Sequence, residues 1–187
     1  MHGVLNKLSK LLATLPNLGP KSANRITIDL AIKQKRLAQI VELLTQVKDE
    51  IKQCIICNNL TETNVCYICS NDSRDKNLIC IVENINSLYA IENTNQYNGI
   101  YYILHGEIQE NEENILKLIN DECEKECVIA INQTIEGQSI KYYLQAFLNQ
   151  YKNVNITTLS VGIPVGGDLD YIDAGTIAAA IHSRKSI

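Results

Sequence analysis

The sequence lacks any uninterrupted apolar run of the roughly 20 residues that a membrane-spanning helix needs. Its N-terminus also lacks the continuous apolar stretch and the small-residue cleavage site of a signal peptide. We therefore expect a soluble, cytoplasmic protein that makes no membrane contact. Internal repeats and low-complexity segments are absent as well. Hydrophobic residues (45%) and charged residues (20%) occur in the proportions of an ordinary globular protein with a core.

Acidic residues are nearly absent from the first 36 residues, where seven lysines and arginines accompany Asp29 alone. The rest of the chain has 10 basic and 20 acidic residues. A basic segment joined to an acidic body indicates that the first segment contacts a polyanion. Charge alone leaves open the alternative of a solvated helix face, because exposed lysine and arginine are common.

Three helices are predicted in the first part of the chain. Apolar residues recur at helical spacing over residues 3–15, and a second helix should run from Pro20 to Lys33, with proline in its first turn. A third apolar seam covers residues 37–51. That seam is too short to argue for a coiled coil, so we expect the third helix to pack on its neighbours.

The periodicity changes after a polar loop region that extends from Cys54 to Asp75. Short apolar β-forming segments then alternate with helical stretches. The segments cover residues 78–82, 100–104, 127–131 and 156–160, and the helical stretches lie near 86–94, 112–124, 137–150 and 173–184. Alternating strands and helices predict an α/β domain with a mainly parallel sheet.

Four of the seven cysteines form two Cys-x-x-Cys pairs separated by eight residues: Cys54, Cys57, Cys66 and Cys69. Two such pairs can place four thiolates at the corners of a tetrahedron, which is the geometry that zinc prefers. A shell of four sulfurs leaves no open position, so we expect one structural Zn²⁺ per chain. Disulfides, an iron–sulfur cluster and a redox motif are the alternatives, and spacing alone does not exclude a cluster.

The segment from Leu15 to Ala23 predicts a tight turn between two helices. Gly19 would let the backbone approach a phosphate, and the N–H groups at the start of the second helix would point toward the anion. Lys21 adds charge one turn into that helix, and Arg25 follows on the same face. Contacts to phosphate carry no base information, so DNA binding should be independent of sequence. A plain pair of helices with a Gly-Pro turn is the alternative.

An acidic residue, Glu83, follows the first predicted strand, at the end where α/β folds place their chemistry. Metal-assisted phosphoryl chemistry would need further carboxylates nearby. The strand at 127–131 is instead followed by Asn132 and Gln133, and Glu136 is the first acid after it. An enzyme that uses Glu83 and magnesium is therefore the less favoured hypothesis.

These features occur in an order that resembles the RecR family of bacterial recombination mediators. The hairpin, the cysteine pairs, Ile81-Val-Glu83, His105-Gly106 and the segment 162–167 carry the resemblance over nearly the whole chain. It implies a multidomain α/β protein with a helix–hairpin–helix, a four-cysteine zinc knuckle, a Toprim-like mainly parallel domain and a C-terminal packing segment. The expected boundaries are 1–52 (DNA binding and oligomerisation), 53–76, 77–165 and 166–187.

The resemblance also implies a function. Family members are non-enzymatic DNA clamps, dimers or tetrameric rings, which work with RecO and RecF to help load RecA onto single-stranded DNA, so a location at the nucleoid is expected. It implies that Cys54, Cys57, Cys66 and Cys69 hold zinc and that Lys21 and Arg25 contact DNA. Glu83 matches the Toprim glutamate, which in catalytic Toprim nucleases and primases acts with a metal-binding acidic pair that is absent here.

Three positions depart from the family pattern. Asn17 stands where glycine is usual, and asparagine tolerates left-handed geometry, so we retain Asn17 beside Gly19 as a DNA-contacting position. Gln138 replaces the second acid of a family Glu-Gly-Glu, and Thr158 replaces a common arginine. Glu83 and Glu136 are the residues that we expect to contact a partner protein.

Overall fold

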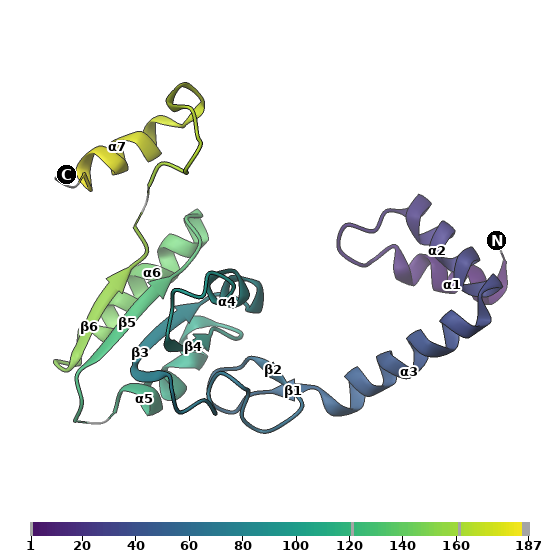
Figure 1. The fold of residues 1–187 in the computed structure, drawn as a ribbon, viewed down its shortest axis with the longest axis horizontal. Coiled ribbons are helices and arrows are strands. Elements are labelled where there is room, and N and C mark those ends of the chain that lie inside the picture. The colour runs from purple at the N-terminus through teal and green to yellow at the C-terminus, as the bar shows by residue number, and fades with distance from the viewer. Residues whose placement is uncertain (1, 121, 161, 185–187) are drawn as a thin grey trace. The chain divides into compact units, whose positions relative to one another are not determined.

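The computed structural model describes residues 2–120, 122–160 and 162–184, and its chain divides into two compact units, Met1–Ile51 and Lys52–Ile187 (Figure 1). No helix among these described residues is long and apolar enough to cross a membrane.

The first unit consists of the helices α1 (Gly3–Leu12), α2 (Pro20–Ile32) and α3 (Gln34–Glu50). The small side chains Ala23 and Thr27 are fully buried on α2, so the backbones of α1 and α2 can approach closely. Ser9 of α1 donates a hydrogen bond to Asn24 of α2 in the same contact. Helix α1 ends before the predicted residue 15, because the chain turns there: the N–H of Thr14 bonds to the carbonyl of Leu11.

Helix α3 contains no buried residue. Its apolar side chains Val41, Leu44 and Val47 are 54%, 63% and 56% exposed. Within its own unit, the expectation that this helix packs on its neighbours is therefore met only near the start of α3, beside α2. The rest of the apolar seam that the sequence shows has no cover among the described residues of that unit.

The second unit is built on a four-stranded sheet of order β4-β3-β5-β6. Its strands are β3 (Asp75–Val82), β4 (Gly99–Ile103), β5 (Lys125–Ala130) and β6 (Val154–Thr158), and all three pairings are parallel. The intervening helices are α4 (Ile85–Glu92), a 3₁₀ turn (Ile108–Asn111), α5 (Glu112–Ile119) and α6 (Ile135–Leu148). This confirms the predicted parallel α/β domain, with Asp121 of the predicted helix 112–124 outside the described residues.

Alternate residues of the central strand β3 enter two different cores. Ile79 and Ile81 pack with apolar side chains of α5 and α6 on one face of the sheet. Cys80 and Val82 pack on the other face, together with Leu88 of α4 and the four clustered cysteines. Because this part of the strand is covered on both faces, residues 78–82 form a continuous apolar run that does not alternate.

The segment with the cysteine pairs contains two short antiparallel strands, β1 (Lys52–Gln53) and β2 (Leu60–Thr61). It also joins the outer edge of β4. The N–H of Ile103 bonds to the carbonyl of Cys57 at 3.0 Å, and the Asn58 side chain donates to the carbonyl of Ile103 at 2.8 Å. This knuckle therefore covers one face of the sheet and closes one of its edges.

The C-terminal segment consists of a 3₁₀ turn (Leu169–Tyr171) and α7 (Ala174–His182). Asp173 caps α7 by accepting the N–H of Thr176 at 2.9 Å. None of residues 162–184 is buried, so none of the apolar side chains in this segment is fully covered within the described chain. The last three residues of the predicted C-terminal region, 185–187, lie outside the described residues.

Candidate zinc site and nucleic-acid interface

The two Cys-x-x-Cys pairs converge on one point. The sulfur atoms of Cys54, Cys57, Cys66 and Cys69 all lie within 4.8 Å of one another, and each of these residues is at most 7% exposed. The local fold places them: the N–H of Cys54 bonds to the carbonyl of Asn59 at 2.7 Å, which closes the first turn. Four converging sulfurs are the donor set of a structural zinc site.

Crowding of the thiols has an electrostatic consequence. A hydrogen bond with Cys66 raises the pKa of the Cys57 thiol, and hydrogen bonds with Cys57 and Cys66 raise that of the Cys69 thiol. The N–H of Cys66 points at the sulfur of Cys54, at 3.3 Å, and supports negative charge there. Four thiolates this close repel one another unless a cation is shared between them, so the geometry fits Zn²⁺.

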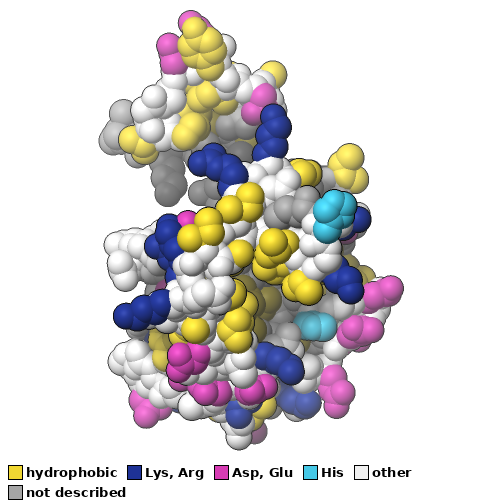
Figure 2. Space-filling view, turned by 90° about the vertical axis from the view of Figure 1, so that its right-hand side faces the viewer, with side chains coloured by type: hydrophobic (Ala, Val, Ile, Leu, Met, Phe, Trp, Pro, Cys, Tyr) yellow, Lys and Arg dark blue, Asp and Glu magenta, His cyan; other side chains and the backbone are white. Residues whose placement is uncertain are grey.

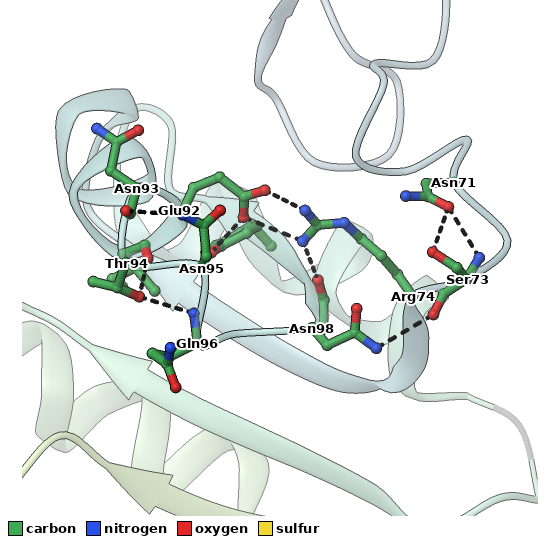
Figure 3. Close-up of polar contacts among 12 residues, drawn as sticks. Asn71, Ser73, Arg74, Glu92, Asn93, Thr94, Asn95, Gln96 and Asn98 are labelled. Atoms are coloured by element: carbon green, nitrogen blue, oxygen red, sulfur yellow. Dashed lines mark hydrogen bonds and ion pairs between the residues drawn. The ribbon is translucent and has the colours of Figure 1, made fainter.

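A polar network joins the end of the knuckle to the sheet (Figure 3). Arg74 follows the last cysteine pair and forms an ion pair with Glu92 at the end of α4. Its guanidinium also donates to the carbonyl of Gly99 at 3.0 Å, while the Tyr101 hydroxyl donates to Glu92 at 2.9 Å. The side chains of Arg74 and Glu92 are only 11% and 18% exposed, so the pair is largely removed from water.

The turn between α1 and α2 contains one residue in the left-handed conformation and an unhindered glycine. Asn17 has φ 61°, the left-handed conformation that the family's usual glycine would also allow. Gly19 has φ −76° and ψ 165°, which any residue could adopt, and a Cβ there would meet nothing within 4 Å. Neither backbone strain nor internal packing therefore accounts for a glycine at position 19.

The basic residues beyond the turn are exposed. Among residues 2–120, 122–160 and 162–184, neither Lys21 nor Arg25 forms an ion pair. Asp29 is instead paired with Lys33 and Arg36, and the hydrogen bond from Lys33 is the main cause that lowers the pKa of its carboxyl. Figure 2 shows a face on which Lys and Arg side chains lie beside hydrophobic ones.

The carboxyl ends of β3, β4 and β5 border a cleft of about 600 Å³. Glu83, Glu107 and Glu136 line it together with Thr134, which caps α6 by accepting the N–H of Gly137 at 3.0 Å. Glu136 is exposed, whereas Glu83 is half-buried and hydrogen-bonded to Asn132. The structure thus brings the two predicted partner-contacting glutamates to one cleft.

Two asparagines at this edge were missed as organising residues. Asn111 is 2% exposed, and its amide donates to the carbonyls of His105 and Glu107 at 2.9 and 2.8 Å, which shapes the loop after β4. In the sequence, Asn132 is distinguished only by standing where metal chemistry would need an acid. Asn111 could not be recognised from the sequence, because its partners lie four and six residues away in a loop without periodicity. The many other asparagines of this chain make it harder still to single out.

Three regions of the chain match known protein families. Residues 51–71 match the zinc-finger domain of RecR, a finger with four cysteine ligands; residues 77–160 match "Toprim domain", and residues 162–185 match "RecR, C-terminal". The chain is 35% identical to the "Recombination protein RecR" of Bifidobacterium adolescentis, covering 99% of this chain and 97% of the relative. It is 37% identical to that of Rickettsia massiliae (97% and 94% covered) and 34% to that of Clostridium perfringens (98% and 96%). Together with the sulfur cluster, the zinc-finger match confirms the prediction of structural zinc.

Proposed function

The chain belongs to the RecR family of recombination proteins, and on that premise we propose that it is a DNA-binding mediator of recombinational repair. In this proposal the hairpin of residues 1–52 binds DNA, the knuckle of 53–76 is held by zinc, and the domain of 77–165 and the segment of 166–187 serve contacts with proteins. The four clustered cysteines are the zinc ligands.

One observation carries the DNA assignment: an exposed turn with an unhindered Gly19 is followed by two exposed basic residues that no acid neutralises within the described chain. Asn17 and Gly19 would present backbone N–H groups to a phosphate, and Lys21 and Arg25 would add charge. Because these contacts reach only the sugar-phosphate strand, affinity should be independent of base sequence and sensitive to salt.

A charge-reversal experiment tests this assignment. Fluorescence anisotropy of a labelled oligonucleotide would be measured for wild type, for Lys21→Glu/Arg25→Glu, and for Lys76→Glu/Lys117→Glu. The control pair makes the same change in net charge at side chains that are 57% and 66% exposed in the other unit. The hairpin variant should lose most binding, and its salt slope should fall by roughly 1.4 to 1.8 for two lost phosphate contacts.

Equal losses in both variants would mean that net charge alone drives binding. Binding by the hairpin variant at wild-type strength would refute the hairpin assignment. Within the described chain, Lys21 and Arg25 make no ion pair, so replacing them should leave the helices folded. Circular dichroism of each variant checks this.

Assembly into a homo-oligomer, a dimer or a tetrameric ring, is the second part of the proposal. The uncovered apolar residues of α3 and of the C-terminal segment support it, since soluble proteins seldom leave such faces in water. The replacement Leu44→Glu should reduce the mass measured by light scattering, whereas Gln46→Glu on the same helix should not. A wild-type protein that remains monomeric at all concentrations would exclude the clamp.

The partner proteins in this proposal are RecO and RecF, and the result of their joint action is RecA loaded onto single-stranded DNA at the nucleoid. The cleft with Glu83 and Glu136 is the expected contact, and Glu136 is its exposed charge. Glu136→Lys should weaken binding of purified RecO or RecF in a pull-down without changing DNA affinity. The Toprim match by itself does not show catalysis, and we propose that the protein has none.

A further inference from the structure

The order β4-β3-β5-β6 creates a switch point in the sheet. From β3 the chain first builds β4 on one side and later returns to place β5 on the other side. The crevice between the ends of β3 and β5 is where open α/β sheets bind ligands. Glu83 directly follows β3, and Asn132 follows β5 across this crevice. In catalytic Toprim enzymes, a glutamate in this position acts with an acidic pair on a metal ion.

The donor set at the crevice does not fit a divalent cation. One carboxylate oxygen of Glu83, Oε1, accepts the backbone N–H of Asn132 at 3.1 Å, and the other, Oε2, accepts the side-chain amide of the same residue. Hydrogen atoms of two N–H donors therefore point at the oxygens that a cation would need. Within the described ranges, the cysteine cluster is the sole group of three or more Cys, His, Asp or Glu side chains close enough to share an ion.

Gly137 shows how closely α6 approaches this contact, although Asn132 itself is exposed. It is buried at the start of α6, where a Cβ would lie 2.1 Å from the carbonyl oxygen of Asn132 and 2.9 Å from Oε1 of Glu83. The glycine therefore allows the first turn of α6 to lie directly on the Glu83–Asn132 contact. Since Glu136 precedes Gly137, the contact also sets where that exposed charge is presented.

We propose that Glu83 and Asn132 form a metal-free latch between the ends of β3 and β5, in the place where a catalytic Toprim domain holds its cation. Glu83 is a positioning residue: it fixes the loop from Ile131 to Thr134 and, through it, the start of α6. The amide of Asn132 takes the role that a cation shared between two acids would otherwise have. A single change, Asn132→Asp, would restore an acid opposite Glu83 and create a need for a cation.

The test compares melting temperatures with a chelator and with millimolar Mg²⁺. The variants are Glu83→Gln, Asn132→Asp, the double variant, and Glu107→Gln, a matched control at an exposed glutamate of the same cleft. Glu83→Gln should lower the melting temperature by roughly 3–8 °C, because two hydrogen bonds to a charged group are lost or weakened. The melting temperature of Asn132→Asp should fall at least as far in the presence of chelator, and it should rise again when Mg²⁺ is added.

The double variant provides the decisive readout. This variant exchanges the hydrogen-bond donor and acceptor, because the glutamine amide at position 83 can donate to the new carboxylate at position 132. Its melting temperature should therefore recover at least half of the fall seen in the single variants. Glu107→Gln and wild type should show no response to Mg²⁺. Additive losses in the double variant, or a Mg²⁺-dependent rise in wild type that Glu83→Gln abolishes, would overturn the latch.

Spectroscopy on the unmodified chain keeps the proposal testable if a variant fails to fold. The backbone and side-chain amide signals of Asn132 in a ¹H–¹⁵N spectrum should not move when Mg²⁺ is added to wild type. A saturable shift of both signals would place the cation at Glu83 and contradict a metal-free contact between Glu83 and Asn132.

Discussion

The hairpin unit and the sheet differ in how far their apolar and charged side chains are buried. The hairpin unit leaves Val41, Leu44 and Val47 in water and exposes Lys21 and Arg25. The sheet unit buries apolar residues on both faces and encloses even an ion pair, Arg74 with Glu92. The difference indicates that the sheet and its knuckle form a covered core, whereas the hairpin unit, like the C-terminal segment of residues 162–184, is arranged for contacts with other molecules.

Zinc removal should produce the largest loss of stability, and this loss should be confined to the sheet unit. The four cysteines share a core with Cys80, Val82 and Tyr101, so losing the metal uncovers one face of the sheet. Coupling between metal binding and folding is worth on the order of 10 kcal/mol in zinc-finger peptides. We expect a chelator, or Cys66→Ser, to abolish hydrogen-exchange protection in β3 while amides of α2 keep theirs. Equal loss in both units would contradict the comparison.

Thiol labelling offers a second measurement of the same event. Cys123 is exposed, the four cluster cysteines are buried, and burial raises the pKa of the Cys80 and Cys127 thiols to about 12. Thiolates are the reactive form. Mass spectrometry should show one rapidly modified thiol in the zinc-bound protein and further ones after chelation, with Cys80 on the uncovered face modified before Cys127, which packs in the opposite core.

Breaking the Arg74–Glu92 pair should have the next largest effect. Glu92→Gln leaves the guanidinium largely buried without its counter-charge, and such losses cost about 3–5 kcal/mol. The free energy of unfolding by urea measures this change. Glu113→Gln is the control, since Glu113 has a side chain that is 86% exposed and lies 3.9 Å from Lys117. Similar values for both variants would show that burial of the pair adds nothing.

Two glycine substitutions sharpen the contrast between the units. At Gly137 a Cβ meets backbone, so Gly137→Ala should cost roughly 1–3 kcal/mol of stability through overpacking. At Gly19 a Cβ meets open space at an ordinary φ, so Gly19→Ala should leave the melting temperature nearly unchanged but weaken DNA binding. Thermal melts and DNA-binding anisotropy of both variants check this. Loss of stability in Gly19→Ala, or weaker DNA binding with unchanged stability in Gly137→Ala, would contradict these assignments.

The smallest effect is expected at Asp29, on the surface of the hairpin unit. The hydrogen bond from Lys33, the charges of Lys33 and Arg36, and the hydrogen bond from Arg36 lower the pKa of its carboxyl. A lowered pKa stabilises the folded state above the unfolded value of about 4, and this gain is lost as the pH falls through the folded value. Asp29→Asn should therefore melt slightly lower than wild type at pH 7, with the gap closing in acid, and should bind DNA slightly more strongly.

Much of the fold could be predicted because its signals are local. Apolar periodicity revealed the helices and the parallel sheet, and two Cys-x-x-Cys pairs revealed the zinc site, since ligand geometry is set within a few residues. The uncovered state of α3 could not be predicted, because an apolar seam has the same pattern whether its cover lies in its own chain or in another molecule.

By itself the sequence determined the composition of each part: a basic hairpin, a sulfur cluster, and strands apolar enough to be buried on both faces. Only the tertiary structure decided that the knuckle covers the sheet and that Asn132, 49 residues beyond Glu83, occupies both of its oxygens. The physical reason is that such contacts depend on strand order and register, which bring distant residues to one edge, and no spacing along the chain encodes them.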